Sequence, residues 1–157
     1  MDDILFYRQA IIHDLPYIVE LLAQDELGQN REVLAQILDH RYRDAFERIN
    51  IDPNQYLMVV ENSEGIVGSC HLTLMPSLTF MGSTRLQIES VRVKDNHRGH
   101  GIGEGMINQA YEYGKSQGAS IIQLTTNKER PRAKQFYERL GFVASHEGLK
   151  MKIISNA

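Results

Sequence analysis

A glycine-rich segment, Arg98-Gly99-His100-Gly101-Ile102-Gly103, has the residue types and spacing that point most directly to chemistry in this chain. It follows a strand-like stretch and opens a stretch with helical apolar spacing. The first amides of a helix have no acceptor within the helix and attract anions, and glycine lets an anion approach them without meeting a Cβ. The segment therefore predicts a phosphate-binding loop. A flexible loop before a glycine-rich helix start is the alternative.

Two familiar nucleotide-binding loops do not match this segment. A Walker A loop has the pattern G-x-x-x-x-G-K-[ST], and a dinucleotide-binding loop has G-x-G-x-x-G. Counted from Gly99 or Gly101, the last glycine of either pattern falls on Glu104 or Met106. The pattern that remains is Arg-x-x-Gly-x-Gly, placed directly after a strand.

The strand before this loop contains a second signal, a change in the phase of its apolar residues. Leu86 and Ile88 are apolar at even positions, whereas Val91 and Val93 are apolar at odd positions. A regular strand keeps its core-facing residues in one phase of two. One extra residue at Glu89-Ser90 therefore predicts a β-bulge, which would bend the strand away from its parallel neighbour. The alternative is that this dipeptide lies on a solvated edge.

The rest of the chain predicts the elements that position this strand and loop. Apolar periodicity, proline near helix starts and glycine at helix ends predict helices at 13–28, 31–49, 101–118 and 130–141, and strands at 4–12, 55–62, 66–75, 85–93 and 121–126, with a final hairpin over 142–155. The three middle strands predict an antiparallel meander, and the strand–helix–strand unit at 85–125 predicts two parallel strands. The expected fold class is α/β (α+β), a single mixed, mostly antiparallel sheet with a central bulged strand and flanking helices.

Composition limits the function classes. The 157 residues are 42% hydrophobic and 24% charged, so we expect one globular domain over 1–157. The net charge of −3 argues against nucleic-acid binding, which usually needs a strongly basic face. No stretch approaches the roughly 20 apolar residues of a membrane span, and the start lacks the basic residues of a signal peptide, so we expect a cytoplasmic protein without a membrane partner. Cys70 alternates with apolar residues and is expected in the core.

Two segments together resemble the GNAT superfamily of acetyl-CoA-dependent N-acetyltransferases. "VRVKDNHRGHGIG" (91–103) is similar to its central motif, a β-branched strand and polar turn followed by R/Q-x-x-G-x-G/A. "AKQFYERLGF" (133–142) is similar to the superfamily's helix ending in F-Y-x-x-x-G-F. The two motifs occur in the expected order and separation, and the resemblance covers roughly residues 85–142.

The resemblance implies acetyl-CoA as co-substrate and assigns the residues that hold it. The pantetheine arm is expected to pair with the backbone of Val91, Arg92 and Val93. The diphosphate is expected on the loop residues Arg98, Gly99, His100, Gly101, Ile102 and Gly103. Many relatives have an asparagine three residues before the alanine of the second motif, where this chain has Arg130, so Asn127 is expected to substitute for it.

The reaction implied is attack of an amine on the thioester carbonyl, in a ternary complex. An alkyl amine has a pKa of about 10.4 and must lose a proton, while the leaving thiolate must gain one. The resemblance makes Tyr137 the acid, although the helical pattern alone would also place it in an amphipathic core stripe. Glu89, at the bulge, is the expected base, with a surface carboxylate as the alternative. His71, on the adjacent strand, is the reserve base.

Partners follow from the same reasoning. The acceptor is a small-molecule or protein amine, expected between the first two helices and the loop 76–84, where the charges are mixed. Because dimers are common among relatives, a homodimer is also open. No metal is expected, since His97 and His100 lie in a glycine-rich loop rather than on one helix face. An acyl-CoA-binding sensor or interaction module of the same fold, without turnover, is the alternative function.

Overall fold

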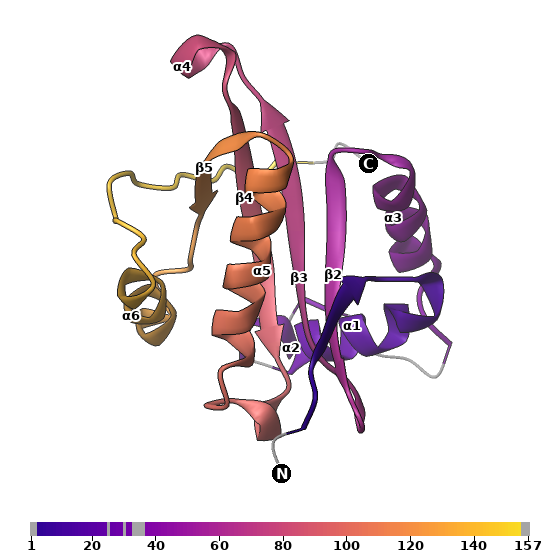
Figure 1. Cartoon of the computed structure of the whole chain (residues 1–157). Coiled ribbons are helices and arrows are strands. Elements are labelled where there is room, and N and C mark those ends of the chain that lie inside the picture. Colours follow the sequence, from indigo (N-terminus) through magenta and orange to yellow (C-terminus); the bar gives the residue numbers. More distant parts are fainter. Residues whose placement is uncertain (1–2, 25, 30, 33–36, 155–157) are drawn as a thin grey trace. The chain divides into compact units, whose positions relative to one another are not determined.

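The structure, a computed structural model, describes residues 3–24, 26–29, 31–32 and 37–154 (Figure 1). Two compact units divide the chain, Met1–Leu124 and Thr125–Ala157. In the described residues, the first unit holds a five-stranded sheet and most of the helices, and the second holds one helix. Among the described helices, none combines the length and the apolar character needed to cross a membrane.

The sheet of the first unit has the predicted mixed, mostly antiparallel topology. Its order is β1-β2-β3-β4-β5, with only the β4–β5 pair parallel. The strands span Phe6–Gln9, Gln55–Asn62, Gly65–Pro76, Thr84–Val93 and Ala119–Leu124. The meander β2-β3-β4 and the parallel return to β5 through a helix therefore confirm the expected fold class.

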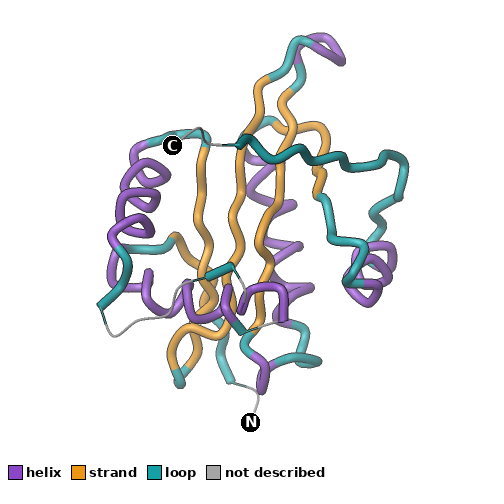
Figure 2. Tube along the Cα trace, turned by 180° about the vertical axis from the view of Figure 1, so that it is seen from behind, coloured by secondary structure: helices purple, strands orange, loops and turns teal. Residues whose placement is uncertain are grey.

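Helices cover both faces of this sheet. In Figure 1, α5 (Ile102–Ser116) crosses in front of it, and in the reverse view of Figure 2, α1 (Leu15–Ala23) lies in front. The helix α5 packs against β3, β4 and β5, whereas α1 packs against β3 and β4, and α3 (His40–Ile51) against β2. The shorter helical turns are η1 (Ile12–Asp14), α2 (Glu26–Gln29), α4 (Thr79–Gly82) and η2 (Asp95–His97).

Two helix boundaries differ from the sequence-based expectation. The helix expected over 31–49 begins at His40 instead, because Asp39 caps it: its Oδ1 accepts a hydrogen bond from the Arg41 amide at 2.9 Å. Residues 31–32 and 37–39 are not helical, and 33–36 lie outside the described residues. The helix expected over 13–28 is divided, since α1 ends at Ala23 and α2 begins at Glu26.

The core of the first unit forms between the sheet and the two helical layers. Apolar side chains alternate along the strands and repeat along the helices, and the largest ones with almost no exposed surface are Leu72, Leu86, Ile88, Met106, Val19, Val59, Val60 and Val67. Cys70 lies among them, as expected. Burial raises the pKa of its thiol to about 12, so Cys70 is a protonated core residue and not a nucleophile.

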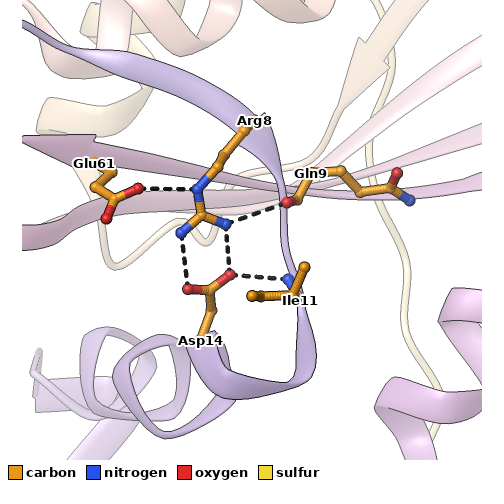
Figure 3. Close-up of polar contacts among 5 residues, drawn as sticks. All are labelled: Arg8, Gln9, Ile11, Asp14 and Glu61. Atoms are coloured by element: carbon orange, nitrogen blue, oxygen red, sulfur yellow. Dashed lines mark hydrogen bonds and ion pairs between the residues drawn. The ribbon is translucent and has the colours of Figure 1, made fainter.

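An arginine joins the first strand to the start of α1 (Figure 3). Arg8 on β1 donates two parallel hydrogen bonds to Asp14, at 2.7 and 2.9 Å, and one to Glu61 on β2 at 2.9 Å. Asp14 also accepts from the Ile11 amide at 2.8 Å. The Arg8 guanidinium holds the pKa of the buried Asp14 carboxyl below its usual range. This network fixes the angle at which α1 leaves the sheet edge.

The second unit departs from expectation after its helix. α6 spans Pro131–Arg139, within the helix expected over 130–141. The hairpin expected over 142–155 is wrong for the described part, because no strand forms between 142 and 154. Leu149, Met151 and Ile153 keep the period-two spacing of a strand, yet each is more than 90% exposed. A hairpin without a core beneath it is marginal, and no described residue of this unit is buried.

Candidate active site

The predicted bulge is present in β4. Ser69 of β3 pairs with Arg92, and His71 pairs with Glu89, so Ser90 and Val91 together oppose the single residue between them on β3. Ser90 has φ +54°, a left-handed conformation that is uncommon for residues other than glycine. The extra residue changes which side chains of β4 face the core, as the phase change predicted.

Beyond the bulge, β4 leaves its parallel neighbour. The β4–β5 ladder ends at Ile88 and Leu124, so 89–93 continue without a partner on β5. The Lys94 amide donates a hydrogen bond to the Val67 carbonyl on β3 at 2.8 Å. The Val93 carbonyl belongs to the same peptide group and points the opposite way, so it faces the β5 side of the strand. Here Arg98 donates to that carbonyl at 3.4 Å. An open strand edge therefore lies beside the glycine-rich loop.

The loop itself has the backbone geometry of an anion-binding site. Gly99 and Gly101 have φ +79° and +80°, and a Cβ at either would meet no atom within 4 Å, so both face open space. Gly101 is the N-cap of α5, and the first helical hydrogen bond runs from the Gly105 amide to the Gly101 carbonyl at 2.9 Å. The amides of 102–104 precede this bond and stand at the positive end of the α5 dipole.

Polar contacts hold the shape of the loop and join it to the turn between β2 and β3. The ring Nδ1 of His100 lies 2.9 Å from the Arg98 carbonyl, which can only accept, so Nδ1 carries the proton. Arg98 pairs with Asp95 at 2.9 Å, and His97 lies 3.1 Å from Glu64. Among the described residues, no group of three histidine, cysteine, aspartate or glutamate side chains gathers as a metal site would require.

Gly105, one turn into α5, has a packing role that the sequence analysis missed. A Cβ at this position would overlap the hydroxyl of Tyr7 on β1. Because Tyr7 and Gly105 are almost 100 residues apart in the chain, no local spacing pattern predicts this contact. The glycine lets a β1 side chain pack against the helix whose N-terminus forms the loop.

The two candidate bases face each other across the β3–β4 ladder. Glu89 is exposed, whereas His71 is half-buried. The Nε2 of His71 lies 2.5 Å from the amide oxygen of Gln55, which also accepts from the Thr73 hydroxyl at 3.0 Å. Nε2 therefore carries the proton and Nδ1 holds the lone pair. Burial lowers the pKa of His71, and the Glu89 charge partly opposes this, so the ring is neutral at pH 7.

A cavity of about 170 Å³ lies beside His71 and the bulge, between the sheet and helices α1 and α3. We call it the α1–α3 cavity. Its lining residues are mostly apolar: Leu15, Ile18, Val19 and Leu22 of α1, Tyr42, Ala45, Phe46 and Ile49 of α3, and Leu57, Ser69, Cys70, His71 and Ser90 of the sheet. The cavity lies on the face of the sheet opposite α5. The sequence analysis expected the acceptor between the first two helices and the loop 76–84, but no residue of that loop and no charged residue is among the described lining.

In the second unit, a local motif orients Tyr137. The Phe142 amide donates to the Tyr137 carbonyl and the Gly141 amide to the Glu138 carbonyl, both at 3.1 Å, and Gly141 has φ +102°. This is a Schellman cap, in which the residue after the glycine packs back on the last turn. The Phe142 ring accordingly lies edge-on to Tyr137, with centroids 5.7 Å apart. The glycine and phenylalanine of the second motif thus end α6 and brace the tyrosine.

Asn127 has a local role in the same unit. Its side-chain oxygen accepts from the Glu129 amide at 2.9 Å, and its carbonyl accepts from the Arg130 amide at 2.9 Å. These bonds form the turn that leads into α6. A coenzyme contact by Asn127 stays a prediction.

Comparison with known proteins identifies the family. The family model for the acetyltransferase (GNAT) family matches residues 17–142. A crystal structure from Bacillus halodurans, described as a transcriptional regulator, has 46% identity and a TM-score of 0.93, covering 96% of this chain and all of the other. A 56-residue stretch is also 43% identical to an N-acetyltransferase of Methanocaldococcus jannaschii. This chain spans only a quarter of that relative's length.

Two curated relatives have stated acceptors. The aminoalkylphosphonate N-acetyltransferase of Salmonella typhimurium is 32% identical over 73% of this chain and 75% of its own length. The glucosamine 6-phosphate N-acetyltransferase of Trypanosoma brucei brucei is 27% identical over 86% of this chain and 95% of its own. With the bulged strand and glycine loop in place, these matches show that the chain belongs to the GNAT family of acetyltransferases.

Proposed function

We propose that this enzyme transfers an acetyl group from acetyl-CoA to a small primary amine, by direct attack in a ternary complex. The observation that carries the proposal is the β4 bulge at Ser90, which leaves an open strand edge directly before a helix N-terminus with two left-handed glycines. Relatives that acetylate a small phosphonate and a sugar phosphate favour a small acceptor over a protein one. A homodimer and a cytoplasmic location stay predictions.

In this proposal, the coenzyme occupies the edge and the loop together. The amides of 102–104, with the loop from Arg98 to Gly101, bind the diphosphate. The pantetheine arm adds to the backbone of 91–93. Arginine side chains now donate to two carbonyls of this edge, Arg92 to Val91 at 3.0 Å and Arg98 to Val93. Coenzyme binding would replace both bonds, which frees Arg98 to reach a phosphate oxygen.

The proposed chemistry uses one base and one acid. The amine nitrogen attacks the thioester carbonyl carbon while its proton passes to the base, the C–S bond breaks, and the thiolate takes a proton from Tyr137. Glu89 is the first candidate base, because it lies at the bulge. His71 is the second, because its neutral ring keeps Nδ1 unprotonated near pH 7.

Two measurements test the proposal. Acetyl-CoA should raise the melting temperature of the protein, since a ligand specific to the folded state stabilises it. Release of coenzyme A thiol should then depend on added amine. An unchanged melting temperature at saturating acetyl-CoA would remove the coenzyme site. Binding without amine-dependent release would leave a coenzyme-binding protein that does not act on the amines tested.

The pH profile separates the two bases. If His71 is the base, His71→Gln should abolish the acidic limb of the kcat/KM profile, whereas Glu89→Gln should leave that limb in place. The reverse result assigns the base to Glu89. General bases typically contribute about 10²–10⁴-fold, so either loss is easily measured.

A further inference from the structure

We infer that the acceptor is a primary amine with an apolar body, about the size of one six-membered ring, which binds in the α1–α3 cavity with its amine toward the bulge. This inference rests on the proposed function and names the substrate class of that same site. It differs from the phosphorylated and phosphonate acceptors named for the two curated relatives.

The size of the cavity limits the apolar body. Its volume is about 170 Å³. An engineered protein cavity of about 150 Å³ lined by leucine, isoleucine and phenylalanine stays dry and binds benzene. A phenyl ring or a branched five-carbon chain therefore fits within it.

The lining selects against charged or strongly polar bodies. None of the described residues that line the cavity is a lysine, arginine, aspartate or glutamate. The Tyr42 hydroxyl, one of its few polar groups, donates to Glu32 at 2.7 Å. A phosphate or a second ammonium group placed here would lose its water without gaining a partner, which is strongly unfavourable.

Apart from the Tyr42 hydroxyl on α3, the polar side chains of the lining come from the sheet at the bulge, which orients the amine. Ser69 and His71 lie on β3 opposite the β4 bulge, and Ser90 is the bulge residue itself. The helices α1 and α3 contribute the apolar wall. An amphipathic amine therefore places its body between the helices and its nitrogen near His71 and Ser90. Since the His71 ring is neutral, it does not repel an ammonium ion that arrives there.

An amine panel tests this inference with thiol release as the readout. The apolar probes are 2-phenylethylamine and isopentylamine; the polar probes are ethanolamine, 2-aminoethylphosphonate and glucosamine 6-phosphate. Because a single methylene in an apolar pocket changes kcat/KM by about 10–200-fold, the apolar probes should exceed ethanolamine by at least about 100-fold. Equal or faster turnover of the polar probes would overturn the inference and leave the proposed function standing.

If none of these amines is turned over, the panel does not support the proposed transfer, and binding alone decides the inference. In that case 2-phenylethylamine should still raise the melting temperature of the full chain, and ethanolamine at the same concentration should not. No shift with 2-phenylethylamine would overturn the inference.

A pair of variants on α3 shows whether the apolar probes use this cavity. Ala45 lines the cavity and is exposed, so Ala45→Phe adds a ring at its mouth without being forced into the core. It should lower the preference for 2-phenylethylamine over ethanolamine at least about 10-fold. Asn50→Phe, exposed on the same helix and absent from the lining, should leave the preference unchanged. Both variants should keep the melting shift with acetyl-CoA, and an unchanged preference in Ala45→Phe would overturn the inference.

Discussion

The two units of this chain use their apolar residues in opposite ways. In the first unit, strands and helices bury a continuous set of leucine, isoleucine, valine and methionine side chains. In the second, no described residue is buried, and Val143, Leu149, Met151 and Ile153 are all more than 80% exposed. Yet each unit carries one of the two family motifs.

The difference shows two ways of holding a functional residue. The glycine loop and the bulge depend on the sheet and on α5 packed against it. Tyr137 instead depends on short-range contacts, the Schellman cap at Gly141 and the ring of Phe142. We therefore expect changes in the first unit to alter global stability and changes in the second to alter turnover.

The largest effect is expected from Tyr137→Phe. Loss of the proposed acid should lower kcat by about 10²–10⁴-fold, with the melting temperature almost unchanged, because the change removes one hydroxyl from a half-buried side chain and keeps its ring. Steady-state kinetics across pH measures the effect. Tyr111→Phe, at an exposed position of α5, is the matched control. Full turnover of Tyr137→Phe at every pH would exclude this residue as the acid.

A pair of identical substitutions compares the stability of the two units. Leu86 in β4 is fully buried, and Leu149 is 92% exposed. Leu86→Ala should lower the free energy of unfolding by about 2–5 kcal/mol, and Leu149→Ala by less than about 0.5 kcal/mol. Denaturant titration measures both. A large loss in Leu149→Ala would show that the C-terminal segment is buried in solution, and the contrast between the units would disappear.

The Arg8–Asp14 pair should give the first unit a pH-dependent stability. The pKa of Asp14 is lowered in the folded state, chiefly by hydrogen bonds from Arg8. Its contribution is therefore complete above the unfolded pKa of about 3.9 and is lost as the pH falls through the lower folded pKa. Since Arg8 is partly exposed, Asp14→Asn should cost about 1–2 kcal/mol at pH 7 and less at a pH below the lowered pKa of Asp14. A cost that is the same at both pH values would contradict this linkage.

The smallest effect is expected from two glycines that end helices. Gly118 follows α5 and Gly141 follows α6, and both have positive φ, at +78° and +102°. Alanine at either position should cost about 1 kcal/mol locally. Gly118→Ala should lower the melting temperature, whereas Gly141→Ala should lower kcat a few-fold by loosening Tyr137. Calorimetry and kinetics on both variants check this, and interchanged outcomes would reverse our assignment of the two roles.

Sequence patterns predicted best where the structure is local or periodic. The strand 55–62 was predicted with its observed bounds, and the parallel strand expected over 121–126 spans Ala119–Leu124. The final hairpin had the same alternation at Leu149, Met151 and Ile153 but was wrong, because alternation describes a strand's faces and does not supply a partner. The second helix began nine residues late, because the capping aspartate at Asp39 outweighed the apolar spacing before it.

The sequence by itself determined the glycine loop and the bulge. Glycine permits the positive φ values of Gly99 and Gly101 locally, and the phase change around Glu89-Ser90 can be counted along one strand. Only the tertiary structure decided the α1–α3 cavity, the contact between Gly105 and Tyr7, and the proton position on His71. These depend on residues brought together from distant parts of the chain, and packing in three dimensions sets which of them meet.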